Sequence, residues 1–197
     1  MLSTLKHNGC WVLGVLILLV AGCAAPLKQA IYLAPGFEPA AIDEITLLPV
    51  QDLRIDREIE VNMEEQIREL GMEILEKKGY RVSLDDNIGN VDEITEDDLK
   101  SGNPKWILRL GPPGARWVMV LTLNDVTTKL VFGSTGNAEV SGFLFDKESG
   151  TIAWHDKGIG RAGQGGCIGC ILKFTMDEAA IDAAVRNLFA SFPKRSK

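Results

Sequence analysis

The sequence predicts an α+β domain in which helices pack on a mixed sheet, with elements in the order β-α-β-(α)-β-β-β-α. Three observations lead to this fold class. An amphipathic helix stands between two short apolar strands, three strand-like segments separated by turns follow, and a second amphipathic helix comes last. Strands joined through a helix pair in parallel, whereas strands joined by short turns pair in antiparallel. We therefore expect a two-layer structure whose sheet contains a three-stranded antiparallel meander.

The first strand–helix–strand unit is predicted from its apolar pattern and its capping residues. Residues 42–50 form an apolar run typical of a buried strand, and residues 80–84 form a second short strand. Between them, Asn62 is a natural N-cap, and Gly79 occupies the position at which helices often end. One face of this helix is apolar: Met63, Ile67, Leu70 and Ile74.

Two short helices are predicted before the meander. Thr95 begins an acidic helix that Gly102 stops, and Asn103 caps another with Pro104 in its first turn. The meander then follows as three strands at residues 116–132, 137–146 and 151–158, separated by turn residues that contain glycine. The first of these strands is long, and we expect its second half to project from the sheet.

The last helix is predicted to begin after Thr175, with Glu178 completing a capping box, and to stop before Pro193. Its apolar positions repeat at helical spacing and predict a buried stripe: Ile181, Ala184, Val185, Leu188 and Phe192.

Residues 1–22 have the pattern of a signal peptide. Lys6 supplies a positive charge, and residues 10–22 form an apolar run that is short for a bilayer span, which needs roughly 20 residues. The run ends in Val20, Ala21 and Gly22 before Cys23, and this resembles the lipobox of bacterial lipoproteins. The resemblance implies cleavage before Cys23 and acylation of that residue. The alternative is an ordinary secretory signal followed by a chance cysteine.

The lipobox also suggests a compartment and a domain organisation. It predicts a lipidated N-terminus with an irregular, proline-containing tether over residues 23–41 and one periplasmic domain over residues 42–197, with Ala24 favouring the outer membrane. The formal net charge is −6, from 21 basic and 27 acidic residues, and loss of Lys6 makes it more negative. Because phosphate binding depends on clustered Lys and Arg, nucleic acid is not expected as a partner. Membrane attachment is expected to come from the lipid alone.

The segment GIGRAGQGGCIGC, residues 158–170, contains the glycine spacing of a dinucleotide-binding fingerprint at Gly158, Gly160 and Gly163. That fingerprint belongs immediately after the first strand of a parallel unit and at the start of a helix. Here the glycines follow the last strand of a meander. We therefore interpret the segment as a flexible loop that leads to the last helix, and no cofactor is expected.

Cys167 and Cys170 in the same segment have the C-x-x-C spacing, for which three interpretations compete. A redox pair would open a helix in a thioredoxin-like unit, and the order of elements does not fit one. A structural zinc site needs four ligands, and His155 would supply only a third, so no metal is expected. The favoured interpretation is a small disulfide-closed loop in an oxidising compartment, with both cysteines as candidates for the bond.

Three other groups of residues have side chains suited to catalysis, calcium binding or an apolar pocket. His155 and Asp156 suggest a general base, but no nucleophile pattern accompanies them, and no catalytic residue is assigned. The carboxylates of residues 85–98 lack the spacing of a calcium loop, and helix caps explain them better. Five aromatic residues could line a pocket, but core packing is the favoured interpretation for them: Trp106, Trp117, Trp154, Phe143 and Phe145.

Together with the lipobox, three segments resemble a known group of proteins: IDEITLLPVQDLR at residues 42–54, GARWVMVLTLNDV at 114–126 and LFDKESGTIAWHDKG at 144–158. They are similar to periplasmic lipoproteins with a fold like the TolB N-terminal domain and CsgG, and most of all to small lipoproteins encoded beside CsgG-like proteins. The C-x-x-C pair departs from that group. The resemblance implies a non-enzymatic envelope protein with a CsgG-like protein or further copies of itself as partner.

Two main functional hypotheses follow, and a third has less support. The first is an interaction or assembly lipoprotein, anchored at Cys23 to the periplasmic face of the outer membrane and acting in secretion or in a cell-wall complex. The second is a periplasmic thiol-disulfide protein that works through Cys167 and Cys170. The third is a carrier of apolar ligands that uses the aromatic side chains.

Overall fold

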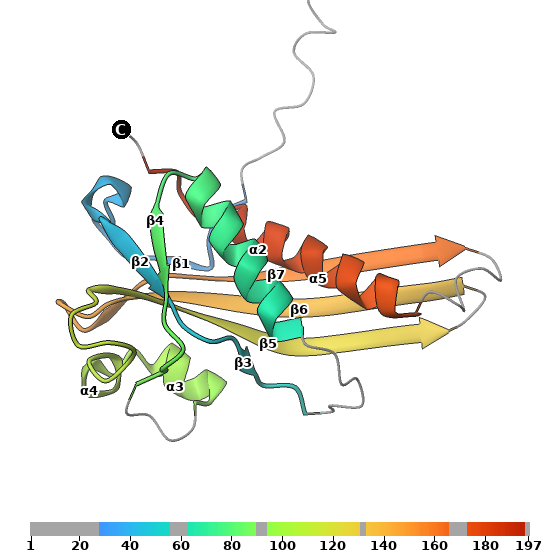
Figure 1. Cartoon of the computed structure of the whole chain (residues 1–197), viewed down its shortest axis with the longest axis horizontal. Coiled ribbons are helices and arrows are strands. Elements are labelled where there is room, and N and C mark those ends of the chain that lie inside the picture. Colours follow the sequence, from blue (N-terminus) through green and yellow to red (C-terminus); the bar gives the residue numbers. More distant parts are fainter. Residues whose placement is uncertain (1–27, 56–62, 90–93, 131–132, 166–172, 196–197) are drawn as a thin grey trace, which may run out of the picture.

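The computed structural model describes residues 28–55, 63–89, 94–130, 133–165 and 173–195. It has a seven-stranded mixed sheet with helices packed against it, which confirms the α+β class and the predicted order of its main elements. The strand order is β1-β7-β6-β5-β2-β4, and the short strand β3 pairs with β5 farther along. Figure 1 shows β5, β6 and β7 extending together well beyond the other strands.

The elements follow the chain in this order: β1 (Tyr32–Leu33), the 3-10 helix η1 (Pro39–Ala41), β2 (Glu44–Leu47), β3 (Gln51–Asp52), α2 (Met63–Lys77), β4 (Arg81–Leu84), α3 (Glu96–Ser101), α4 (Pro104–Ile107), β5 (Trp117–Leu130), β6 (Gly133–Asp146), β7 (Thr151–Gly165) and α5 (Lys173–Phe189). No helix among the described residues is both long and apolar enough to cross a membrane.

The first unit has the predicted strand–helix–strand order, and the predicted N-cap Asn62 lies outside the described residues. Strand β2 pairs in parallel with β4, and α2 connects them. The helix ends in a Schellman motif, in which the amide of Tyr80 donates to the carbonyl of Leu75 and the amide of Gly79 donates to that of Glu76. Gly79 has φ of 95°, a left-handed conformation that glycine adopts without steric cost. The glycine therefore turns the chain directly from α2 into β4.

The meander consists of β5, β6 and β7, which pair in antiparallel. Trp117 of β5 lies opposite Asp146 of β6, and Asp146 lies opposite Thr151 of β7. Strand β5 has parallel partners only as far as Leu123, where β3 ends. Beyond that point the meander continues alone as an arm, which we define as residues 125–130, 133–140 and 157–165. This confirms that the second half of β5 projects from the rest of the sheet (Figure 1).

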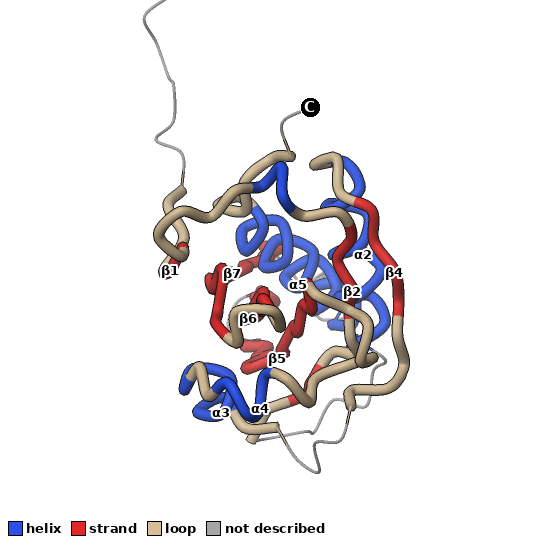
Figure 2. The backbone as a smooth tube through the Cα atoms, turned by 90° about the vertical axis from the view of Figure 1, so that its left-hand side faces the viewer, coloured by secondary structure: helices blue, strands red, loops and turns tan. Residues whose placement is uncertain are grey.

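The sheet separates two apolar clusters. On one face, α2 and α5 pack over a large cluster that includes Leu121, Leu144, Trp154 and Phe189. On the other face, α3 and α4 pack over a smaller one that includes Val120, Phe143 and Phe145. Figure 2 shows α2 and α5 on one side of the strands and α3 and α4 on the other. Helix α5 lies along β7 and β6, so one face of the arm is covered.

Three expectations about the ends of these elements are wrong. Strand β6 begins at Gly133, so residues 133–136 are strand and not turn. Strand β7 continues to Gly165, so the first part of the glycine-rich segment is strand and not loop. Helix α5 begins at Lys173, so Thr175 lies within its first turn and is not the N-cap. The predicted buried stripe is confirmed on α5 at Ile181, Ala184, Val185 and Leu188, whereas Phe192 is buried but lies beyond the end of the helix at Phe189.

Part of the predicted tether belongs to the domain. Strand β1 pairs with β7 at Tyr32↔His155 and Leu33↔Trp154, and the amide of Ala34 donates to the carbonyl of Ala153 at 2.9 Å. Proline is unfavourable inside regular elements, but β1 has only two residues, which lie between Pro26 and Pro35. Within the described residues, the predicted irregular tether therefore contains a short strand at Tyr32–Leu33 and a 3-10 helix at Pro39–Ala41.

Candidate functional site

The three cysteines to which the sequence assigned chemistry lie outside the described residues. Cys23 precedes Lys28, where the description begins, and Cys167 and Cys170 fall between β7 and α5. Acylation at Cys23 and a bond between Cys167 and Cys170 therefore stay predictions. The structure describes instead the region that follows Cys23 in the chain, where β1, β7 and the end of α5 meet.

Gly158 and Gly160 serve helix packing. Both lie in β7 on the face that α5 covers. A methyl group on Gly158 would stand 1.9 Å from the carbonyl oxygen of Ala184, and one on Gly160 would stand 1.8 Å from that of Ala180. The backbone of the helix thus lies directly on the backbone of the strand. This close approach explains two of the three glycines whose spacing resembled a dinucleotide fingerprint, Gly158 and Gly160.

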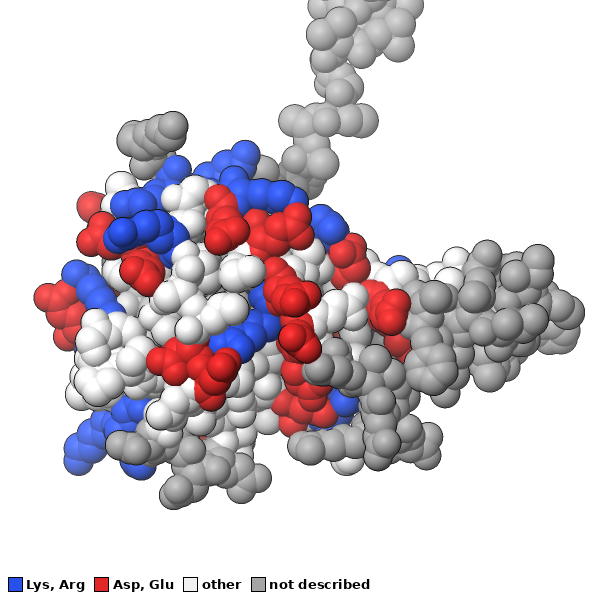
Figure 3. All heavy atoms as spheres, viewed as in Figure 1, with Lys and Arg blue, Asp and Glu red and all other residues white. Residues whose placement is uncertain are grey.

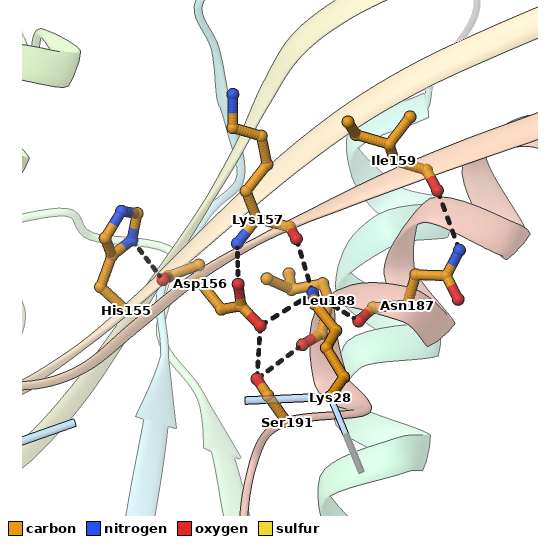
Figure 4. Close-up of polar contacts among 9 residues, drawn as sticks. Lys28, His155, Asp156, Lys157, Ile159, Asn187, Leu188 and Ser191 are labelled. Atoms are coloured by element: carbon orange, nitrogen blue, oxygen red, sulfur yellow. Dashed lines mark hydrogen bonds and ion pairs between the residues drawn. The ribbon is translucent and has the colours of Figure 1, made fainter. Parts of the chain in front are cut away.

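His155 and Asp156 point to opposite faces of the sheet, as consecutive strand residues do. The imidazole of His155 stacks on the ring of Phe143, with centroids 4.1 Å apart, and its Nδ1 lies 3.2 Å from the carbonyl oxygen of Gly142. Burial lowers the pKa of His155, opposed in part by the Gly142 carbonyl. Asp156 lies on the α5 side (Figure 4). The two side chains therefore do not form an acid–base pair.

Asp156 is the centre of a buried polar cluster, with its residue only 1% exposed. Its Oδ1 accepts a hydrogen bond from the amide of Lys157 at 2.7 Å. Its Oδ2 accepts one from Oγ of Ser191 at 2.5 Å and forms an ion pair with Nζ of Lys28 at 2.8 Å. Both carboxylate oxygens are thus satisfied, as a buried charge requires.

Lys28 joins the beginning of the described chain to two distant elements. Its ammonium group also donates to the carbonyl of Lys157 in β7, at 2.7 Å, and to the carbonyl of Asn187 in α5, at 2.9 Å. Figure 4 shows these contacts converging from the strand and from the helix. Together with the Asp156 ion pair they hold the chain at Lys28, five residues after Cys23.

The same side chains protect the outer edge of β7. The carbonyl of Lys157 is occupied by Lys28, and the carbonyl of Ile159 accepts from Nδ2 of Asn187 at 2.9 Å. The amide of Lys157 is occupied by the carboxylate of Asp156. An exposed strand edge invites pairing with another chain, and occupied backbone groups prevent it. Close to β1, therefore, this edge of the sheet is closed to a further strand.

The arm has one covered and one uncovered face. On the covered face, Ala138, Val140, Gly158 and Gly160 are buried under α5. On the other face, Lys157 binds Glu139 at 2.9 Å, and Ile159 is 52% exposed. Figure 4 shows the side chains of Lys157 and Ile159 directed away from α5. The α3 and α4 cluster covers the sheet on this side only as far as the start of the arm. Among the described residues, no helix packs on this face of the arm itself.

The other motifs have structural roles. Thr95 and Asp98 form a reciprocal capping box, in which the Thr95 hydrogen bonds hold the pKa of Asp98 below its usual value. Asp85 accepts from the amide of Asn87, and Asp86 pairs with Arg68. Within the described ranges, no three His, Cys, Asp or Glu side chains are grouped to hold a metal ion. Four of the five aromatic residues are buried in the two clusters, and Trp106 packs partly buried on Phe145.

Sequence reasoning missed Lys28, Asn187 and Ser191. Lys28 stood in a segment interpreted as tether, and the other two lie at the exposed end of a helix, where polar residues are ordinary. The only signal was the charge of Asp156 on a strand position that faces the core, because a buried carboxylate needs a partner.

Comparison with known proteins shows the fold. No protein-family model and no curated protein matches the sequence. A PelC dodecamer from Paraburkholderia phytofirmans is similar in structure, with a TM-score of 0.50 and 11% identity over 84% of this chain and 95% of that one. Lipoprotein GNA1162 from Neisseria meningitidis matches with a TM-score of 0.44 and 16% identity over 69% of this chain and 96% of that one.

A minor lipoprotein from Acinetobacter baumannii matches with a TM-score of 0.41 and 8% identity, over 81% of this chain and 100% of that one. The solved structures that this chain resembles thus include bacterial lipoproteins. The likeness to PelC defines a fold that the two chains share. The resemblance to the TolB and CsgG group stays a prediction.

Proposed function

We propose that this chain is a non-enzymatic lipoprotein of the bacterial envelope, anchored through Cys23 to the periplasmic face of the outer membrane and acting as an interaction or assembly factor. The observation that carries the proposal is the arm. Among the described residues, one of its faces is uncovered and exposes Ile159, while α5 covers the other face. A sheet face that is left uncovered over this length is suited to contact with another protein.

Further copies of the same chain are the partner that we favour. Side chains close the described β7 edge near β1, so strand addition is disfavoured at that part of the edge and the face of the arm is the contact that we favour. The structurally similar PelC is a dodecamer. We infer that this chain assembles in the same general manner, with the arm of one copy packed against the next. A CsgG-like protein remains the alternative partner.

The anchor is tested by mass spectrometry of the full chain after expression in a Gram-negative host. We expect cleavage before Cys23 and an increase in mass equal to the acyl groups, both lost in Cys23→Ser. An unmodified chain that keeps residues 1–22, or one that is cleaved at another position, contradicts the anchor.

Assembly is tested by light scattering on the detergent-solubilised full chain. We expect an oligomer that Ile159→Asp dissociates, because the substitution places a charge in the centre of the contact. Leu108→Asp is the matched control, since Leu108 is similarly exposed, at 57%, but lies after α4. A monomer at every concentration, or equal effects of the two substitutions, contradicts assembly through the arm.

A thiol-disulfide function is the second candidate, and one observation favours it. Cys170 precedes Lys173, the first residue of α5, so the pair lies close in sequence to a helix N-terminus, where thiol pKa values fall. Titration of the pair against glutathione separates the two functions. A potential below about −300 mV indicates a structural bond, whereas one between about −200 and −120 mV supports redox activity.

A further inference from the structure

The residues around β1 form an exposed apolar ridge, and beside it lies a hollow that is lined by lysine side chains. Ile31, Tyr32 and Leu33 are 61%, 43% and 46% exposed, and they are the only consecutive large apolar residues that the described chain exposes to this degree. Exposed apolar residues that occur singly are ordinary, but a contiguous group indicates a contact surface. Figure 2 places β1 at the margin of the molecule, away from the helices on both faces of the sheet.

The hollow lies on one side of this ridge, between the segment from Lys28 to Leu33 and the end of α5. It encloses about 670 Å³, and its walls include Ala30, Leu33, Phe192 and Pro193. The charged side chains that line it are Lys28, Lys78 and Lys194, and no carboxylate of the described ranges lines it. Figure 3 shows several Lys and Arg side chains along the upper margin of the molecule, with Asp and Glu side chains between them.

The lysines differ in how their charge is compensated. Lys28 is neutralised by Asp156, and nearby Arg195 pairs with Asp43 at 3.5 Å. Lys78 donates to the carbonyl of Phe192 at 2.6 Å. Burial, and then the like charge of Lys194, lower the pKa of Lys78. Among the described residues, Lys78 and Lys194 make no ion pair, so this hollow carries positive charge on a chain that is acidic as a whole.

The length of chain before Lys28 limits where this surface can lie. Five peptide steps separate Cys23 from Lys28, and at about 3.5 Å per residue they span at most about 18 Å. The Lys28 contacts fix the near end of that length to β7 and α5. An acyl anchor at Cys23 would therefore keep the ridge and the hollow within reach of the lipid headgroups, and it would leave the arm free to move farther away.

We propose that the β1 ridge and the adjoining hollow rest on the anionic phospholipid surface of the membrane, with Ile31, Tyr32 and Leu33 among the headgroups and Lys78 and Lys194 against lipid phosphates. The proposal rests on the lipid anchor proposed above. It departs from the expectation that lipid alone attaches the chain, which stays a prediction. A tyrosine beside aliphatic side chains is a favourable combination at a membrane–water interface, because its ring is apolar and its hydroxyl is polar.

The test uses the full chain, reconstituted into vesicles of phosphatidylcholine with or without phosphatidylglycerol. A photoreactive benzoylphenylalanine replaces Tyr32 in one sample and Ile159, on the arm, in the control. After irradiation we expect lipid adducts several-fold more abundant at position 32 than at position 159. Equal yields at both positions, or adducts at position 32 that join two protein chains, overturn the proposal.

The role of the lysines is tested in the same vesicles. Lys78→Gln and Lys194→Gln are each expected to lower the ratio of lipid-contacting to free domains by up to about fivefold, which corresponds to about 1 kcal/mol for a basic residue near an anionic surface. Lys105→Gln, in α4, is the control. The decrease should vanish without phosphatidylglycerol. Lys194 is exposed, so its variant keeps the test valid if Lys78→Gln disturbs the fold.

The mass of the reconstituted chain separates this proposal from the anchor itself. If Cys23 is acylated and position 32 does not contact lipid, the surface is wrong and the anchor stands. If Cys23 is unmodified, the anchor is wrong, and lipid adducts at position 32 then support the surface by themselves while their absence overturns it.

Discussion

His155 is the only histidine in residues 23–197, and its half-buried imidazole lies against the ring of Phe143. Burial holds its pKa below the ordinary value of 6.5, so the unfolded chain takes up a proton at a higher pH than the folded one. The stabilisation is complete above pH 6.5 and is lost as the pH falls through the lower folded pKa. The free energy of unfolding should therefore decrease between about pH 7.5 and 5.5, a range in which most carboxylates remain ionised.

Urea denaturation across this pH range checks the prediction. In His155→Gln the decrease should disappear, although the lost ring stacking lowers the stability at every pH. An identical pH dependence in the two proteins would assign it to other groups.

Asp156 and Lys28 contribute unequally to stability because their exposures differ. Asp156→Asn keeps the size of the side chain but places an amide group against the donors of Lys28 and Ser191. We expect it to lower the free energy of unfolding by about 2 to 3 kcal/mol. The side chain of Lys28 is 36% exposed, so solvent screens its ion pair, and Lys28→Gln should cost about 1 kcal/mol. Chemical denaturation measures both, with Lys105→Gln as a neutral control. If Lys28→Gln lost as much stability as Asp156→Asn, solvent would screen the ion pair less than the exposure of Lys28 indicates.

At the scale of elements, the contact between β7 and α5 depends on two glycines. Gly158→Ala places a methyl group 1.9 Å from a helix carbonyl, which can be relieved only by moving the whole helix. We expect a loss of about 3 kcal/mol or more in the free energy of unfolding. Gly114→Ala is the control, because no atom lies within 4 Å of its added methyl group. Similar stabilities of the two variants would mean that α5 adjusts at little cost.

Strand β1 is held by few hydrogen bonds and by the Lys28 contacts. In Lys28→Gln we expect faster hydrogen exchange at the amide of Ala34, which donates to Ala153, while amides of β5 and β6 keep their protection. Exchange followed by mass spectrometry or NMR measures this difference. Unchanged exchange at Ala34 would show that the β1 pairing and the packing of Phe37 on Trp117 suffice to hold the segment.

At the scale of the whole molecule, both apolar clusters rest on the same strands. Trp154 reports on the cluster under α2 and α5, and Trp106 lies against the one under α3 and α4. Because β5 and β6 contribute to both, we expect the two faces to unfold together. Urea midpoints from the fluorescence of Trp106→Phe and Trp154→Phe, each compared with its own circular dichroism, should coincide. Distinct midpoints within one variant would indicate two cooperative units.

The order of the main elements could be predicted from the sequence because each depends on local signals. The stripe from Met63 to Leu70 and the glycine at position 79 define α2, and the alternation in residues 137–146 defines β6. The end of β7 could not be predicted, since glycines at positions 158, 160 and 163 weaken strand propensity. The approach of Ala180 and Ala184 makes glycine favourable at positions 158 and 160.

The sequence by itself determined the α+β class, the meander and the amphipathic helices, and it predicts an acylated N-terminus at Cys23. These features are encoded by neighbours along the chain, through periodicity, caps and spacing. Only the tertiary structure decided that Asp156 binds Lys28 across more than a hundred residues, that His155 faces away from it, and that β1 joins the sheet. Those outcomes depend on which face of a strand is covered, and that is fixed by packing between distant segments.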